Sequence, residues 1–182
     1  MTTALLIIDV QQALCTGEFA AFEVERVIDR INLVSRKARA AGVPVVIIQH
    51  ESQGGPFQHG TEGWQLAKRL EALPTDTYIR KKATDSFHET ELQSVLQAWN
   101  VNNLIICGLQ SEFCVDTTTR RALALGYPVV LVADGHSTSS NSVLSAAQIS
   151  AHHNVTLANI TSFGPRATAV VASEVKVEAK PN

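Results

Sequence analysis

The sequence predicts an α/β fold: a three-layer α/β/α domain on a mostly parallel sheet of about six strands. Two observations lead to this prediction. Short apolar runs without alternation recur along the chain, as expected for strands that are covered on both faces. Between them lie segments whose apolar residues recur at helical spacing, so helices should connect the strands and leave them parallel.

The first element pair is a βαβ unit at the N-terminus. Residues 4–8, Ala-Leu-Leu-Ile-Ile, form an apolar run, and Asp9 stands at its carboxyl end. Residues 23–41 carry apolar side chains at helical spacing, and Gly42 is placed to end that helix. A second apolar run, 43–48, follows at once. The crossover between the two strands should be right-handed.

The region 49–78 does not continue this alternation. Gly54-Gly55-Pro56, Gly60 and Gly63 interrupt any period, which predicts an irregular excursion over the carboxyl edge of the sheet. A short strand is expected near 77–80, directly after it.

The alternation then resumes, with helices expected near 92–99, 114–125 and 143–152 and strands near 104–107, 129–133 and 155–160. Neither a linker nor a repeat divides residues 1–182, so we predict a single domain with a Rossmann-like open sheet. The tail from Ser173 lacks a comparable pattern, and we expect it to be loosely held or used between subunits.

Composition limits the functional classes. The 182 residues are 45% hydrophobic and 18% charged with a formal net charge of −2, which provides no positive field for nucleic acid or anionic membranes. No stretch approaches the ~20 apolar residues of a membrane span, and the N-terminus has no basic leader. Three cysteines argue against a disulfide framework in a chain of this size. We therefore expect a cytoplasmic protein without a membrane or nucleic-acid partner.

Cys114 is the first candidate for chemistry. It stands where the strand over 104–107 gives way to the next predicted helix, and a helix N-terminus favours thiolate and can hold an oxyanion. A free cysteine is, alternatively, often a small core residue. Cys107 continues a buried strand and Cys15 lies in a loop without basic or helix-start context, so we interpret both as structural.

Asp9 and the Lys81-Lys82 pair are the other candidates. A carboxylate that ends an apolar strand lies where burial can prepare it as a base, although aspartate is also a common turn former. One of the two ammonium groups near a cysteine would stabilise its thiolate, whereas adjacent lysines are also typical of solvated surface.

Three segments, taken together, resemble the isochorismatase-like hydrolases. They are Ile8-Asp9-Val10-Gln11, then Lys81 to Phe87 with Thr90-Glu91-Leu92, and Cys107-Gly108-Leu109-Gln110-Ser111-Glu112-Phe113-Cys114-Val115-Asp116-Thr117-Thr118. They occur in the family's order, and the resemblance spans roughly residues 4 to 160.

The resemblance implies a catalytic set of Cys114 as nucleophile, Asp9 as base and Lys81 as third member. It also implies a cis peptide at Leu109-Gln110, with the N–H groups of Gln110 and Cys114 facing an oxyanion. The implied reaction is hydrolysis of an amide or related C–N bond through a thioester. We further expect the pKa of Cys114 to lie below its free value of ~8.5 because of Lys81.

Some features depart from relatives within that family. Nicotinamidases carry a metal site written Asp-x-His, but this chain has His50-Glu51-Ser52 and a distant His59, so we expect no metal. We leave open whether His50 or His59 takes part in the pocket. True isochorismatases lack the nucleophilic cysteine, so Cys114 favours the amide reaction over that one.

The remaining expectations concern ligands and alternatives. Leu14, Phe19, Trp64 and Phe113 are candidate apolar walls for a small-molecule substrate. Nucleotide-binding glycine motifs are missing, so no cofactor is proposed. A homo-oligomer is expected because symmetric assembly is common among enzymes. The alternatives are an isochorismatase-type hydrolase of another bond class, or a non-catalytic binding domain on the same fold.

Overall fold

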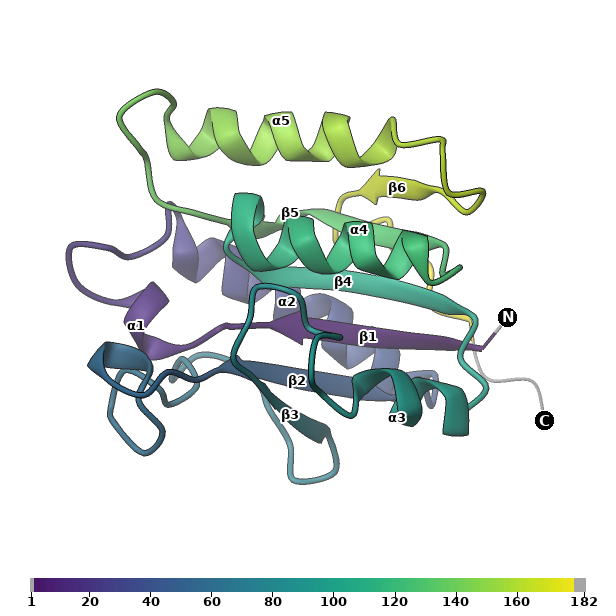
Figure 1. Ribbon diagram of the computed structural model, residues 1–182, viewed down its shortest axis with the longest axis horizontal. Helices are drawn as coiled ribbons and strands as arrows, with labels where there is room; N and C mark the ends of the chain where they lie inside the picture. The colour runs from purple at the N-terminus through teal and green to yellow at the C-terminus, as the bar shows by residue number, and fades with distance from the viewer. Residues whose placement is uncertain (1, 179–182) are drawn as a thin grey trace.

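The computed structural model describes residues 2–178, which form one six-stranded, fully parallel sheet (Figure 1). The strand order is β3-β2-β1-β4-β5-β6. The strands are β1 (Thr3–Ile8), β2 (Val45–His50), β3 (Thr77–Lys81), β4 (Asn103–Leu109), β5 (Val129–Ser137) and β6 (Ala167–Val170). The predicted three-layer fold is confirmed.

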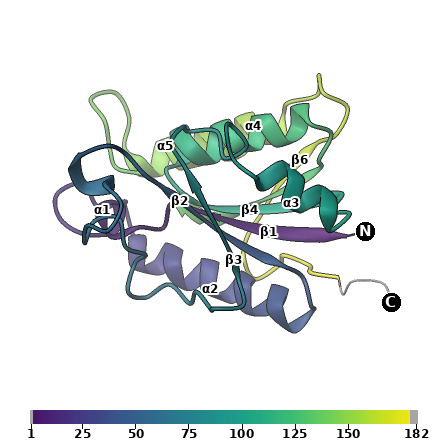
Figure 2. The same cartoon turned by 60° about the horizontal axis from the view of Figure 1, so that its bottom comes forward.

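Helices cover both faces of the sheet. Figure 2 shows α2 (Val24–Ala40) below the sheet and α3 (Leu92–Ala98), α4 (Asp116–Ala124) and α5 (Ala146–Ala158) above it. Two buried apolar clusters correspond to these layers, one on each face. Ile7 and Ile31 belong to the α2 side, whereas Ile8 and Leu96 belong to the other. Because β1 is buried along its whole length, both faces of its apolar run are used.

Strand order reverses between β1 and β4, which makes this the switch point of the sheet. Gly108 lies opposite Ile8 there and has a φ of +123°. A Cβ at Gly108 would collide with the backbone nitrogen and carbonyl oxygen of Ile8. Glycine is therefore required for β4 to lie this close to β1.

The excursion between β2 and β3 packs onto α2 through polar contacts. It contains a short 3-10 turn, Gly55–Phe57, and the region just after β1 holds the one-turn helix α1 (Gln12–Cys15). The side chain of Asn32 donates to the carbonyl of Arg69 and accepts from the N–H of Glu71. These contacts fix irregular backbone that has no sheet partner.

The prediction for the last helix and strand was wrong. Residues 155–160 are not a strand, because α5 continues to Ala158 and the sixth strand is β6. A capping box of Ser145 and Gln148 starts the helix, and Val155, which suggested a strand, lies on its solvent side with 63% of its surface exposed. β6 escaped notice because it has only four residues, Ala-Thr-Ala-Val.

The tail packs against α2 as far as it is described. Val175 is buried, and the ammonium of Lys37 donates to the carbonyls of Ala172, Ser173 and Val175. Residues 173–178 are thus held by the domain, while 179–182 lie outside the described residues. Within residues 2–178, none of the helices has both the length and the apolar content that a bilayer span requires.

Candidate active site

The cysteine lies on a wide helical turn at the switch point of the sheet. Residues Ser111–Val115 form one π-type turn, here named the cysteine turn, which leads directly into α4. Cys114 thus stands just before α4, where sequence predicted the helix itself to begin. The Leu109-Gln110 bond that precedes the turn is cis.

Asp9 comes to the same place from the end of β1. Its backbone is left-handed, with a φ of +52°, a conformation that aspartate tolerates better than most residues. Its side chain is 1% exposed. The Oδ2 atom accepts from Lys81, whereas the buried Oδ1 has no hydrogen-bond partner among the described residues.

Lys81 is the centre of the cluster. Its Nζ lies 2.7 Å from Asp9 Oδ2, 3.2 Å from Cys114 Sγ and 3.0 Å from the carbonyl oxygen of Ala83. An ammonium has three protons, and these three acceptors account for all of them. A buried ammonium needs such pairing, because an unpaired charge in the core is strongly destabilising. Lys82 is exposed, so Lys81 is the lysine that reaches the cysteine.

Packing contacts fix the segment that follows Lys81. The side chain of Phe87 is buried and stacks against Tyr127, with 6.2 Å between ring centroids. The Ser86 hydroxyl lies 2.8 Å from that of Thr118 on α4, whose hydroxyl also accepts from the Ser86 N–H. The segment after Lys81 is thereby tied to the same helix that follows Cys114.

Gln11 fixes the end of β2 beside the cluster. The fully buried side chain donates to the carbonyls of His50 and Trp64 and accepts from the N–H of His50. It therefore replaces sheet hydrogen bonds where β1 has already ended. The sequence pattern included Gln11 but assigned it no role.

His50, whose part in the pocket the sequence left open, lies beside the cluster. Its Nδ1 lies 3.5 Å from Lys81 Nζ, at the outer limit of a hydrogen bond. Burial and the charge of Lys81 lower the pKa of His50, so its ring is neutral at pH 7. His59 instead packs against Trp64, with ring centroids 4.4 Å apart.

The electrostatics of Cys114 differ from the sequence expectation. Burial raises the pKa of the Cys114 thiol to about 12, and the charge of Asp9 adds to this while Lys81 opposes it. Although burial alone lowers the pKa of Lys81, Asp9 and Cys114 raise it above its usual value. The expectation of a low thiol pKa neglected first the burial of the sulfur and then the charge of Asp9, which opposes that of Lys81. The resting cysteine is therefore a thiol that needs a base.

The four candidate substrate residues are dispersed around this centre. Phe19 and Phe113 have 71% and 50% of their surface exposed, and Leu14 on α1 is partly exposed. Trp64 lines a cavity of about 570 Å³ together with Gln49, Glu51, His59, Tyr78, Arg80 and Glu91. Nothing in this geometry assigns a ligand to them, so their role stays a prediction.

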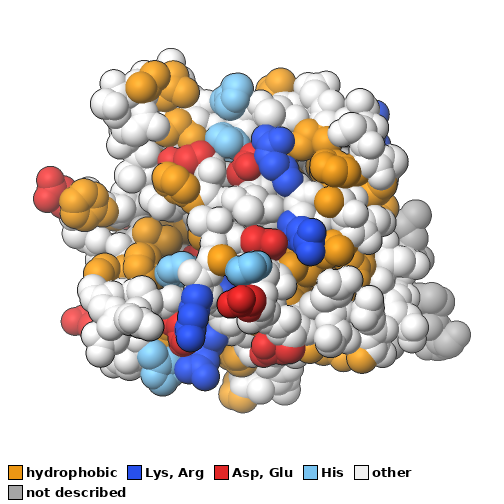
Figure 3. All heavy atoms as spheres, in the orientation of Figure 1, with side chains coloured by type: hydrophobic (Ala, Val, Ile, Leu, Met, Phe, Trp, Pro, Cys, Tyr) orange, Lys and Arg blue, Asp and Glu red, His pale blue; other side chains and the backbone are white. Residues whose placement is uncertain are grey.

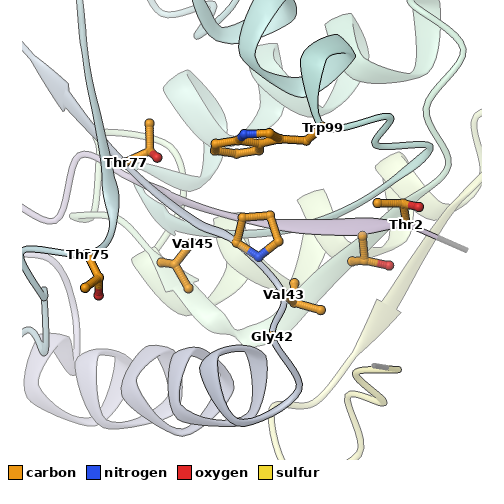
Figure 4. Close-up of a pocket in the computed structure, with 9 residues that line it drawn as sticks. Thr2, Gly42, Val43, Val45, Thr75, Thr77 and Trp99 are labelled. Carbon is orange, nitrogen blue, oxygen red and sulfur yellow. The ribbon is translucent and has the colours of Figure 1, made fainter. Parts of the chain in front are cut away.

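A second cavity and a charged face lie outside the cluster of Asp9, Lys81 and Cys114. A cavity of about 330 Å³ lies near Thr2, Val43 and Trp99, at the amino edge of the sheet and remote from Cys114, and contains no titratable side chain (Figure 4). Charged side chains of both signs and histidines gather on the face in Figure 3. Within residues 2–178, no three His, Cys, Asp or Glu side chains are grouped so as to hold a metal ion.

Known proteins with similar sequences and structures identify the family to which this chain belongs. The chain is 41% identical over 136 residues to a streptothricin hydrolase of Streptomyces noursei, a match that covers 74% of this chain and 49% of that protein. A ureidoacrylate amidohydrolase of Pseudomonas savastanoi is 28% identical over 72% of this chain and 69% of its own length. The chain thus spans about half the length of the streptothricin hydrolase it matches.

A solved structure agrees with these relatives. The crystal structure of an isochorismatase from Pseudomonas putida superposes with a TM-score of 0.88 at 27% identity, covering 96% of this chain and 90% of that one. The model of the isochorismatase domain matches residues 3–163. With the three sequence motifs meeting at one switch point, the chain belongs to the isochorismatase family.

Proposed function

We propose that this protein is a metal-independent cysteine hydrolase that cleaves an amide or related C–N bond of a small molecule through a thioester. The observation that carries the proposal is the contact set of Lys81, whose ammonium touches both Asp9 Oδ2 and Cys114 Sγ. A nucleophile, a base and a fixed positive charge are thus within reach of one another.

The reaction would begin with the thiol. Asp9 Oδ1, buried and without a partner among the described residues, is available to accept the Cys114 proton as Sγ attacks the carbonyl carbon. The Lys81 ammonium, 3.2 Å from the sulfur, stabilises the negative charge that develops there. Since burial raises the pKa of Cys114 to about 12, proton transfer and attack should occur together.

The later steps reuse the same groups. The N–H groups of Gln110 and Cys114 would hold the tetrahedral oxyanion. Protonated Asp9 would give its proton to the leaving nitrogen, and ammonia or an amine departs as the thioester forms. Asp9, again a carboxylate, would then take a proton from water, which attacks the thioester and releases the acid, and Asp9 returns that proton to Sγ to restore the thiol.

The printed names of two relatives support this reaction class, since one is a hydrolase and the other an amidohydrolase. We also propose a cytoplasmic location and a homo-oligomer, supported by three free cysteines and by the frequency of symmetric enzymes.

Ammonia release across primary amides, ureides and lactams tests the proposal, with Cys114→Ala and Cys114→Ser as the variants. Wild type should turn over at least one of these, and both variants should lose about 10³-fold or more, because a covalent route has no replacement nucleophile. Circular dichroism should show both variants folded. Wild-type rates in Cys114→Ala would exclude the covalent route, and turnover of a vinyl ether instead of any amide would favour another bond class.

Iodoacetamide labelling addresses the non-catalytic alternative. A catalytic Cys114 should be alkylated stoichiometrically, and this alkylation should abolish turnover. A protein that binds amides but never releases ammonia would be a binding domain on this fold.

A further inference from the structure

A second buried polar network touches the cysteine turn from the β5 side. His136 is 3% exposed, and its Nδ1 lies 2.8 Å from the hydroxyl of Ser111, the first residue of the turn. Its Nε2 lies 2.9 Å from Asn154 Oδ1 on α5. The Ser111 hydroxyl also lies 2.9 Å from that of Ser150, again on α5.

The direction of every hydrogen bond in this network can be assigned. The amide nitrogen of Asn154 donates to the carbonyl of Ala133, so its oxygen must face His136. That oxygen can only accept, so Nε2 carries a proton, and because burial favours the neutral ring, Nδ1 keeps its lone pair. Ser111 therefore donates to His136, and Ser150 donates to Ser111. The imidazole is neutral, in keeping with the burial that lowers its pKa.

Glu112, the next residue of the cysteine turn, is also tied to the end of β5. Thr138, just beyond β5, donates from its hydroxyl to Glu112 Oε1 at 2.9 Å. The register pairs Gly108 with His136 and Leu109 with Ser137, so the end of β5 runs beside the entry to the turn. Ser111 and Glu112 are thus anchored to one strand end, before the chain reaches Cys114.

We infer that His136 is a positioning residue, which holds the cysteine turn through Ser111 so that the N–H groups of Gln110 and Cys114 face the oxyanion. The inference rests on the proposed function. Ser111 directly follows Gln110 and opens the turn that ends beyond Cys114, so a displaced Ser111 moves both donors. Oxyanion donors act only when their positions are fixed before reaction.

Two substitutions at His136 separate this role from simple packing. In His136→Asn, the amide oxygen lies near the former position of Nδ1 and can still accept the hydrogen bond from Ser111. In His136→Gln, the longer side chain reaches the former position of Nε2, so it keeps the hydrogen bond to Asn154 and loses the one from Ser111. His136→Gln should lower kcat roughly 10- to 100-fold with little change in KM. His136→Asn should stay within a few-fold of wild type. The substrate is any amide that wild type hydrolyses.

The rate at which iodoacetamide alkylates Cys114 distinguishes a positioning role from a merely structural one, because a structural defect would slow both alkylation and turnover. This displacement forms no oxyanion, so His136→Gln should be alkylated at the wild-type rate while its turnover falls. Ser111→Ala should reproduce the loss of kcat, and Ser150→Ala is the matched control, because it removes only the outer hydrogen bond. These serine variants also keep the test decisive if His136→Gln does not fold.

The outcomes are distinguishable from failure of the proposed function. Full activity in both His136→Gln and Ser111→Ala, with Cys114→Ala inactive, would overturn this inference alone. Parallel losses of turnover and alkylation in those variants would also overturn it, since the turn would then matter only for the integrity of the site. Turnover that survives Cys114→Ala would instead remove the proposed function, and the inference with it.

Discussion

Two buried polar networks contact the cysteine turn, and they are built on opposite principles. The first, Asp9, Lys81 and Cys114, is charged and leaves Asp9 Oδ1 without a partner among the described residues. The second, Ser150, Ser111, His136 and Asn154, is neutral and closed, because each donor in it has an assigned acceptor. An open acceptor beside a thiol permits proton transfer, whereas a closed chain can only hold geometry.

The difference follows from where the residues originate. The charged network joins the ends of β1 and β3 to the cysteine turn, across the switch point where α/β sheets bind ligands. The neutral network joins the same turn to β5 and α5 instead. We therefore expect substitutions in the first network to change chemistry, and substitutions in the second to change precision or stability.

The largest effect beyond Cys114 itself should come from Lys81→Ala compared with Lys82→Ala. Loss of Lys81 leaves the charge of Asp9 unopposed beside the sulfur and raises the pKa of Cys114 further, so alkylation near pH 8 should slow at least about tenfold. Exposed Lys82 should change that rate little, because salt and water screen it. Alkylation rate against pH measures both; equal profiles would remove Lys81 from the charged network.

Lys81→Ala also leaves a buried carboxylate unpaired, which can destabilise the protein by ~3–5 kcal/mol. Denaturant unfolding should therefore accompany the kinetics, and rates should be measured well below the melting temperature. Because the pKa of Lys81 is raised in the fold, the stability it contributes is fully present below its unfolded pKa and is lost as the pH rises through the folded value.

Lowering the pH should reduce the stability of the protein through His136 of the neutral network. Burial lowers the pKa of His136, so below pH ~6.5 the unfolded chain binds a proton that the folded chain resists, and stability falls as the pH decreases. His136→Asn lacks this group and should lose less stability than wild type between pH 7.5 and 5.0, as measured by denaturant unfolding at both pH values. His50, whose pKa is also lowered, is common to both proteins. Identical pH dependence would mean that His136 is protonated in the fold.

A smaller effect is expected from Cys107, which, like Cys15, belongs to neither network. It is fully buried in β4, its sulfur lies 3.6 Å from the carbonyl of Leu6, and burial raises its pKa. Cys107→Ala should cost about 1 kcal/mol of stability and leave turnover unchanged. Cys15, whose pKa burial raises to about 12, offers a matched control as Cys15→Ala. A loss of turnover in Cys107→Ala but not in Cys15→Ala would mean that Cys107 contributes to the reaction and not only to packing.

The smallest effect, none at all, is expected from chelation. The charge that stabilises sulfur in the first network is the ammonium of Lys81, so prolonged dialysis against a chelator should leave the rate unchanged. Activity lost to chelation and restored by zinc or iron would contradict this, and would require a metal in the charged network.

Much of this protein follows from its sequence because the determining signals are local. Unbroken apolar runs define β1, β2 and β4, and the position of Asp9 after such a run places it at the ligand-binding edge without knowledge of any contact. The resemblance of the three motifs to a known family likewise singles out Asp9, Lys81 and Cys114. The start of α5 was placed near Val143, although Ser145 and Gln148 form a readable capping signal just before Ala146.

Only the tertiary structure decided how these groups behave. The pKa of Cys114 depends on burial and on Asp9, which is more than a hundred positions away in the chain, so no local pattern could reveal that these two effects outweigh the charge of Lys81. His136 entered no motif, because its partners come from the cysteine turn and α5 and meet only when β5 pairs with β4. Sequence determines which groups a chain carries, whereas their charge state and hydrogen bonds depend on neighbours that folding brings together.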